Sequence, residues 1–234
     1  MSIHPTAVIG YGVELGTGVV IAPYAVLTGP CRVGDRVWIG PHATIGTPPE
    51  IRGVPHPPLG DAVDGNHPGV VIGADTVVRE YVAVHHGIER TTEVGSGCFL
   101  MAYSHVPHDA WLGRGVTLSS GVHLGGHTWI GTGANLGLGA TVHQRCTVGA
   151  YAMVGMQSAV TRSVPPFSLA IGVPARVTGA NRIGLERLGL DDATTEAWHQ
   201  VLASGGTAGE DHPDLGEHVA RYRAALRGAP QRVS

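Results

Sequence analysis

An aliphatic residue recurs at every sixth position along most of this chain, and this period restricts the fold more than any other feature. The first run extends from Ile3 to Ile45, the second from Ile72 to Val84 and the third from Val94 to Val160. A helix needs apolar residues about 3.6 positions apart and an ordinary strand needs strict alternation, so neither explains the period. A six-residue repeat is typical of a parallel β-helix, in which stacked repeats bury a core that no single repeat could bury.

A second column, four residues after the aliphatic one, contains small or β-branched residues. The three cysteines of the chain, Cys31, Cys98 and Cys146, all occupy this column. We therefore interpret them as buried small hydrophobes rather than as redox or metal groups. Glycine commonly follows the aliphatic residue, where we expect a sharp corner to require backbone angles that a Cβ would penalise.

Composition excludes several classes of function. The chain of 234 residues has 36 glycines, two phenylalanines and 14% charged residues, which suits a narrow interior built from small side chains. Its formal charge of -3 offers no basic patch, so nucleic-acid binding is not expected. The start of the sequence lacks the features of a signal peptide, and no apolar run approaches the ~20 residues of a membrane span. We expect a cytoplasmic protein without a transmembrane segment.

The sequence divides into two parts. We expect a β-helix domain over residues 1–183, with a loop insertion at 46–71 and a shorter interruption at 85–93, followed by a C-terminal helical cap over 184–234. One helix is predicted over 191–203. A second is predicted to begin at Asp214 with Glu217 completing a capping box. It would place four apolar residues on one face: Leu215, Val219, Tyr222 and Leu226.

The repeat also predicts which residues lie next to one another in space. Three hexads form one coil, so residues 18 apart are expected in adjacent coils at the spacing of neighbouring strands, ~4.8 Å. His105 then lies beneath His123, and His108 beneath Gly126. Five histidines therefore gather on the outside of three coils: His105, His108, His123, His127 and His143.

These neighbours suggest acyl transfer to a hydroxyl group. The neutral imidazole of His108 could remove the hydroxyl proton, and Asp109 beside it could fix the tautomer and stabilise the imidazolium. Gly126 has no side chain to block its backbone N–H, which could face a developing oxyanion. The pattern predicts direct attack on the acyl donor without a covalent enzyme intermediate.

Several segments resemble the UDP-N-acetylglucosamine O-acyltransferases of lipid A synthesis. They are FLMAYSHVPHDAWLG (99–113), LGGHTWIG (124–131), ATVHQ (140–144), AYAMVG (150–155), VPPF (164–167) and GANRIGLERLGL (179–190). The resemblance implies an all-β left-handed parallel β-helix and a homotrimer with active sites between subunits. It also implies acyl carrier protein as the donor's carrier, a UDP-aminosugar as acceptor, and neither a cofactor nor a metal ion.

The resemblance also implies roles for individual residues. His108 would be the general base, Asp109 its partner and the Gly126 amide the oxyanion donor. Asn181 and Arg187 of the neighbouring subunit would hold the uridine diphosphate, because the planar guanidinium of Arg can form two hydrogen bonds to one phosphate. The remaining substrate-binding residues would be His85, His105, His127, His143 and Gln144.

Met156 occupies the position where the resemblance implies a residue that measures the acyl chain. A Met there would close the groove and select a medium-length chain, and we expect a 3-hydroxyacyl group. The alternative is that Met156 only fills a gap between coils. The sequence departs from the family on the acceptor side, where TPPEIRG offers Glu50 and Arg52 in place of an Asp-Leu-Lys segment and Ile183 replaces a Glu.

Four other interpretations remain open. The same chemistry could act on another nucleotide sugar or on a natural-product sugar. A coenzyme A-dependent acetyltransferase is a second alternative. A zinc hydratase would need three histidines converging across a subunit boundary. A non-catalytic binding solenoid would need flat, repetitive outer faces, in contrast to the clustered histidines.

Overall fold

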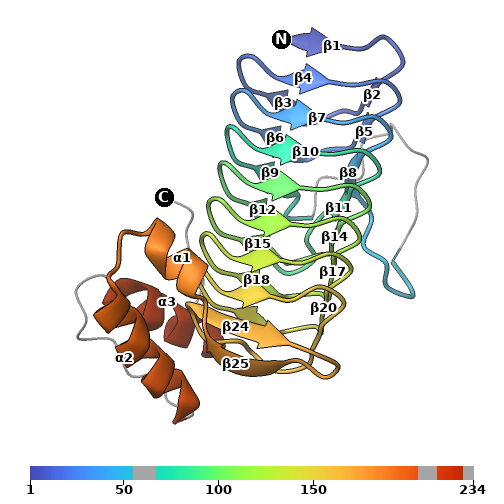
Figure 1. Cartoon of the computed structure of the whole chain (residues 1–234). Helices are drawn as coiled ribbons and strands as arrows, with labels where there is room; N and C mark the ends of the chain where they lie inside the picture. Colours follow the sequence, from blue (N-terminus) through green and yellow to red (C-terminus); the bar gives the residue numbers. More distant parts are fainter. Residues whose placement is uncertain (55–66, 205–214, 229–234) are drawn as a thin grey trace.

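The computed structural model describes residues 1–54, 67–204 and 215–228. Short parallel strands stack into a prism with three sheets, and the helices of the described ranges pack beside its C-terminal end (Figure 1). The parallel β-helix predicted from the six-residue period is thereby confirmed. None of the described helices has the length and apolar character needed to span a membrane.

Successive strands alternate among three sheets, which we call sheets A, B and C. Sheet A contains β1 (Ser2–Ile3), β4 (Val20–Ile21), β7 (Trp38–Ile39), β10 (Val77–Val78), β13 (Phe99–Leu100), β16 (Thr117–Leu118), β19 (Asn135–Leu136), β22 (Met153–Val154), β24 (Ser168–Ile171) and β25 (Arg176–Ala180). Sheet B contains β2 (Val8–Ile9), β5 (Val26–Leu27), β8 (Thr44–Thr47), β11 (Ala83–His85), β14 (His105–Val106), β17 (His123–Leu124), β20 (Thr141–Val142) and β23 (Ala159–Val160). Sheet C contains β3 (Val13–Leu15), β6 (Cys31–Val33), β9 (Val70–Ile72), β12 (Thr92–Val94), β15 (Trp111–Leu112), β18 (Trp129–Ile130) and β21 (Thr147–Val148).

Residues 18 apart face each other in neighbouring coils, as the sequence predicts. His105 pairs with His123 between β14 and β17. Across the long insertion Val33 of β6 still pairs with Ile72 of β9, although the register shifts where the insertion begins, between Val84 and His85 of β11. The insertion therefore loops out between β8 and β9 while the ladder of backbone hydrogen bonds continues beneath it.

The aliphatic column forms the core of the prism. Its members are buried from Ile21 to Val160, whereas Ile3 and Ile9 near the N-terminal end are 39% and 37% exposed. The cysteines lie in the same core, and burial raises the pKa of Cys31 to about 12 and that of Cys98 to about 11. Their interpretation as small buried hydrophobes is confirmed.

Glycine is required after the aliphatic residues for a different reason from the one expected. A Cβ on Gly34 would lie 2.6 Å from the backbone nitrogen of Ala74, and a Cβ on Gly95 would lie 2.7 Å from the carbonyl carbon of Gly113. A positive φ falls two residues later instead, as at Gly97, where φ is 66°. The close approach of adjacent coils, rather than an unusual backbone angle, therefore requires glycine there.

The turns between sheets A and B, here the A–B corner, carry a ladder of stacked rings. Tyr24, His42, Tyr81 and Tyr103 follow one another in successive coils, with ring centroids 5.2, 5.0 and 5.0 Å apart. All four have positive φ, and all four side chains are exposed. The repeat therefore stacks like side chains on like positions even at its outer surface.

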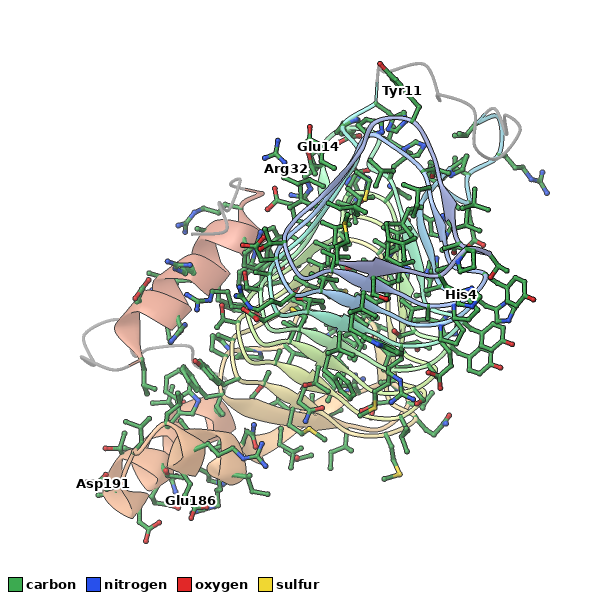
Figure 2. The ribbon with its side chains drawn as sticks, turned by 90° about the horizontal axis from the view of Figure 1, so that it is seen from above. His4, Tyr11, Glu14, Arg32, Glu186 and Asp191 are labelled. Carbon is green, nitrogen blue, oxygen red and sulfur yellow. The ribbon has the colours of Figure 1, made fainter. Side chains whose placement is uncertain are left out.

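A hairpin and a small helical part close the prism. Strands β24 and β25 pair antiparallel, and α1 (Arg182–Arg187), α2 (Asp192–Ala203) and α3 (Gly216–Leu226) follow. The prediction of α2 is confirmed, and its N-terminus is capped by Asp191, which accepts from the Thr194 N–H. The sequence did not predict α1, and the expected division at 183/184 falls inside it. In Figure 2, Glu186 and Asp191 lie at the far end of this helical part from His4.

The third helix differs in part from its prediction. It begins at Gly216, preceded by Leu215 without a side-chain cap, and Asp214 lies outside the described residues. Leu215, Val219 and Tyr222 are buried as predicted, but Leu226, the last residue of the helix, is 51% exposed. That core joins the end of the prism to the helices through Phe167, Ala180, Leu185, Trp198, Leu202, Leu215 and Val219.

The outer face of sheet C near the N-terminal end carries a charged pair. Glu14 of β3 and Arg32 of β6 project outward together from the same side of the coils when the molecule is seen from above (Figure 2). Their charged groups are 3.1 Å apart and largely exposed, so the pair contributes little to stability.

Candidate active site

Both interruptions of the repeat lie between sheets B and C, which we call the B–C corner. The chain leaves β8 after Thr47 and re-enters the prism at Val70 of β9, and residues 86–91 separate β11 from β12. The described part of the first insertion runs down the side of the prism next to the strands of sheet B (Figure 1). The inserted segments therefore build walls beside the turns that follow β14, β17 and β20.

A pocket of about 520 Å³ opens at this corner. Its walls come from the first insertion, from the end of β11 and from three consecutive turns of the B–C corner. It is lined by Glu50, Ile51, His85, His105, Pro107, His108, Leu124, Gly125, Gly126, His127, Gln144 and Arg145. The pocket thus brings together seven of the residues predicted for the site: Glu50, His85, His105, His108, Gly126, His127 and Gln144.

His108 and Asp109 form a hydrogen-bonded pair in the turn between β14 and β15. The Nδ1 atom of His108 lies 2.7 Å from Oδ2 of Asp109. Because a carboxylate can only accept, Nδ1 carries the hydrogen and Nε2 keeps its lone pair. The side chain of Asp109 is fully buried and that of His108 is 14% exposed, so the imidazole alone meets the pocket.

The second oxygen of Asp109 is held by three backbone amides. Oδ1 accepts hydrogen bonds from the N–H groups of Ile88, Glu89 and Arg90, at 3.0, 2.9 and 2.8 Å. Burial alone would raise the pKa of Asp109, but the hydrogen bonds from His108 and from these amides outweigh it and lower the pKa below its ordinary value. Asp109 therefore remains an anion able to orient His108 and to stabilise its protonated form.

Sequence reasoning missed this role of residues 86–91. The segment departs from the six-residue period, and only that departure signals a special structure. Its tight turn depends on Gly87, since a Cβ there would overlap the carbonyl oxygen of Arg90. The Arg90 side chain adds a further bond from Nε to the carbonyl oxygen of Asp109, at 2.9 Å.

Gly126 lies directly over the imidazole of His108, one coil further along the prism. A Cβ on Gly126 would lie 2.5 Å from Nε2 of His108, so no larger residue fits without moving the imidazole. Within the described ranges, the Gly126 N–H has no hydrogen-bond acceptor. A free donor therefore lies beside the lone pair of a fixed imidazole, which is the arrangement predicted from the sequence.

Two further residues stack above Asp109 in the same backbone conformation. Asp109, His127 and Arg145 have φ values of 60°, 60° and 62°, in the left-handed region. Nε2 of His127 is 3.7 Å from Oδ2 of Asp109. Burial, together with nearby Arg145, lowers the pKa of His127, which keeps this imidazole neutral near pH 7 despite the opposing effect of Asp109.

A second polar group also lines the pocket. Glu50 from the first insertion approaches His105 of β14, with 3.4 Å between the Glu50 carboxylate and Nε2 of His105. The ring of His85 lies edge-on to that of His105, with centroids 5.0 Å apart. Burial and the neighbouring His85 lower the pKa of His105.

Five predicted residues lie away from this pocket. Met156 is 69% exposed on the A–B corner. Asn181 caps α1, accepting from the Gly184 N–H at 3.2 Å and donating to the Tyr151 carbonyl at 2.8 Å. The remaining three are exposed and do not line the pocket: Arg52, His143 and Arg187.

Comparison with known proteins identifies the family. The model of the bacterial transferase hexapeptide family (six repeats) matches residues 91–126. An acyl-[acyl-carrier-protein]–UDP-N-acetylglucosamine O-acyltransferase from Thermodesulfovibrio yellowstonii is 38% identical over 196 residues, covering 82% of this chain and 72% of the relative. The chain belongs to this acyltransferase family.

Other relatives support the assignment. A protein of the same name from Brucella ovis is 42% identical over 203 residues, covering 81% of this chain and 72% of its own. The UDP-N-acetylglucosamine acyltransferase structure from Campylobacter jejuni superposes with a TM-score of 0.76 at 25% identity, covering 99% of this chain and 98% of that one. The LpxA structure from Acinetobacter baumannii, at 23% identity and a TM-score of 0.79, covers 100% and 99% and shows the same fold. The family predicted from the sequence motifs is confirmed, and this chain is an acyltransferase.

Proposed function

We propose that this acyltransferase moves an acyl group from an acyl carrier protein thioester to a hydroxyl of UDP-N-acetylglucosamine or a related UDP-aminosugar. Membership of the family supports the overall reaction. The observation that carries the proposal is the position of the His108 imidazole at the wall of one pocket, where it is fixed by Asp109 and packed against Gly126, whose N–H has no acceptor among the described residues.

In the proposed reaction, His108 acts as a general base. Nε2 of His108 takes the proton from the sugar hydroxyl as its oxygen attacks the thioester carbonyl carbon. The charge that develops on the carbonyl oxygen is stabilised by the Gly126 N–H, and Asp109 stabilises the imidazolium. When the tetrahedral intermediate collapses, the C–S bond breaks and the imidazolium returns the proton to the leaving thiolate. No covalent enzyme intermediate is formed.

The remaining polar residues of the pocket suit an acceptor rich in hydroxyl groups. We assign Glu50, His85, His105, His127 and Gln144 to acceptor binding. The carboxylate of Glu50 can accept hydrogen bonds from the hydroxyls, and the neutral imidazole of His105 offers one lone pair more. These groups line the same pocket as His108, which supports acceptor binding with a hydroxyl within reach of the base.

Met156, Asn181 and Arg187 lie outside the pocket of a single chain, and we propose that a neighbouring copy in a homotrimer supplies them to the complete site. Mixing two inactive variants tests this assembly. Refolded mixtures of His108→Ala and Arg187→Ala chains should recover activity through sites formed from one intact half of each, whereas each variant alone should stay impaired. Light scattering should give a trimer, and a monomeric active enzyme would contradict the proposal.

The donor and acceptor are best tested with a panel of both. We expect turnover with medium-chain 3-hydroxyacyl groups on acyl carrier protein and with UDP-N-acetylglucosamine, measured by mass spectrometry of the product. Transfer from acyl-coenzyme A at an equal rate, or acylation of none of the UDP-aminosugars, would contradict the assignment.

A different sugar acceptor is the second candidate, and the acceptor side of the site favours it. Arg52, one of the two residues that replace the family's Asp-Leu-Lys segment, lies outside the pocket, and Ile183 is 62% exposed where the family has a Glu. Other nucleotide sugars and natural-product sugars therefore belong in the same panel.

A further inference from the structure

The group formed by Glu50, His85 and His105 has the geometry of a metal site. One ligand atom from each of these residues lies within 4.8 Å of the other two. The three residues are far apart along the chain, and Glu50 belongs to an insertion outside the repeat. Only the folded chain brings them together.

Backbone carbonyls fix the tautomer of both imidazoles. Nδ1 of His85 lies 2.7 Å from the carbonyl oxygen of Pro48, and Nδ1 of His105 lies 3.3 Å from that of Leu124. A carbonyl oxygen only accepts, so each Nδ1 carries the hydrogen and each Nε2 presents its lone pair. Donation of the other ring N–H to a carbonyl is also how metal-ligating histidines are usually oriented.

Both lone pairs are buried without a hydrogen-bond partner among the described residues. Nε2 of His85 and Nε2 of His105 are inaccessible to solvent, and the His85 side chain is nine-tenths buried. Buried polar atoms in native proteins nearly always have a partner, so two unpaired ones side by side require an explanation. Each could bind one ligand atom, or both could bind the same ion.

The spacing favours a single ion. A tetrahedral zinc ion with bonds of about 2.1 Å separates neighbouring ligand atoms by about 3.4 Å. The Glu50 carboxylate lies 3.4 Å from Nε2 of His105, which matches that separation. Two imidazoles and one carboxylate suit zinc, whereas magnesium and calcium prefer oxygen ligands.

We propose that Glu50, His85 and His105 bind one zinc ion per chain, with the fourth coordination position open to the pocket. The other group of possible ligands, His108, Asp109 and His127, is less suitable because Oδ2 of Asp109 already accepts from His108.

The proposal has a consequence for catalysis that rests on the proposed function. If Glu50, His85 and His105 receive the acceptor's hydroxyls, zinc occupies the same three atoms. The ion then competes with the nucleotide sugar and acts as an inhibitor, while binding of the acyl donor is unaffected.

Zinc binding is tested without substrates, which separates this proposal from the reaction. The protein is stripped with a chelator, dialysed and titrated with Zn²⁺ by calorimetry, as wild type and as Glu50→Gln, His85→Gln and His105→Gln. We expect one ion per wild-type chain and a loss of affinity of about 10-fold or more in each variant. His123→Gln, an exposed histidine in the next coil from His105, is the matched control and should bind as wild type does.

Cobalt provides a measurement that does not depend on the variants folding. Co²⁺ added to the stripped wild type should give the visible absorption of a four-coordinate ion, and Zn²⁺ should displace it. The proposal is overturned if wild type binds no stoichiometric zinc, or if His127→Gln abolishes binding while His85→Gln does not. Zinc binding without any acyl transfer would overturn the proposed function alone.

Discussion

Two corners of the same prism share a left-handed backbone conformation but differ in the burial of the side chains that it carries. At the A–B corner, four residues separate each of the strand pairs β4–β5, β7–β8, β10–β11 and β13–β14, and the rings of Tyr24, His42, Tyr81 and Tyr103 stack in the open. At the B–C corner, Asp109 and His127 have the same left-handed backbone, but Asp109 is completely buried.

The difference comes from the insertions. Amides of residues 88–90 cover Asp109, and Glu50 and Ile51 from the longer insertion form part of the pocket wall. Where the repeat continues unchanged, stacked residues remain a solvated ladder. Where a segment leaves the repeat and folds back, the same kind of position becomes desolvated, and its charge and hydrogen bonds become strong enough to direct chemistry.

The variant with the largest expected effect removes the base at the B–C corner. His108→Ala should lower turnover by about 10² to 10⁴, the range for a positioned acid–base group, because nothing else at the pocket wall can take the proton in that position. The melting temperature should change little. His123→Ala, an exposed histidine on β17, is the control and should retain wild-type turnover. Wild-type activity in His108→Ala would remove the distinction between the two corners.

A second test opens the inserted turn without touching the base. In Gly87→Ala the added methyl group must displace the Arg90 carbonyl, so the hydrogen bonds from the amides of residues 88–90 to Asp109 should weaken or break. We expect kcat to fall by about 10²-fold, as for a misplacement of a catalytic group by 1 Å, with KM for the acceptor much less affected.

The control for this variant is Gly97→Asn, at a site with open space and a positive φ that Asn tolerates. An equal loss of kcat in both variants would show that Gly87 has no special part in positioning Asp109.

A third test asks whether the A–B corner contributes to specificity. Met156→Gly should shift the preferred acyl chain towards greater length, because the exposed side chain no longer closes the proposed groove. Leu138→Gly, 18 residues earlier and 50% exposed, is the matched control. Product chain lengths are measured by mass spectrometry with a mixture of acyl donors. An unchanged profile would leave Met156 as a surface residue of the repeat.

The smallest effect is expected at the aromatic ladder. Tyr81→Ala removes two stacking contacts, so the free energy of unfolding should fall by about 1 to 2 kcal/mol, with turnover unchanged. Chemical denaturation measures the first quantity. Tyr11→Ala, at a residue 78% exposed, should have a smaller effect on stability. A large loss of activity in Tyr81→Ala would mean that this corner also belongs to the active site.

The sequence predicts the parts of the molecule that follow the repeat. The 18-residue coil fixes His105 beside His123 and Gly126 over His108, because strand pairing in a closed prism leaves no freedom of register. The motifs predict the family. The same reasoning could not find the three amides that hold Asp109 or the approach of Glu50 to His105, since loop conformations depend on contacts that have no period.

Other errors have similar physical causes. The sequence suggests unusual backbone angles at glycines such as Gly34. In the structure, glycine is required there because the next coil lies too close for a Cβ, and this distance is known only once the coils are stacked. The six residues of α1 carry too little pattern to predict a helix, and the family resemblance gives its cap, Asn181, only the role of a substrate ligand.

The left-handed backbone of Asp109, His127 and Arg145 has a consequence for engineering. Non-glycine residues in this conformation cost on the order of 1 kcal/mol each, and glycine adopts it freely. A laboratory evolution experiment that rewarded only heat resistance would therefore favour glycine at His127 and Arg145, whereas Asp109 is retained by the hydrogen bonds that its carboxylate accepts. Thermostable versions of this enzyme should be sought through substitutions elsewhere in the prism.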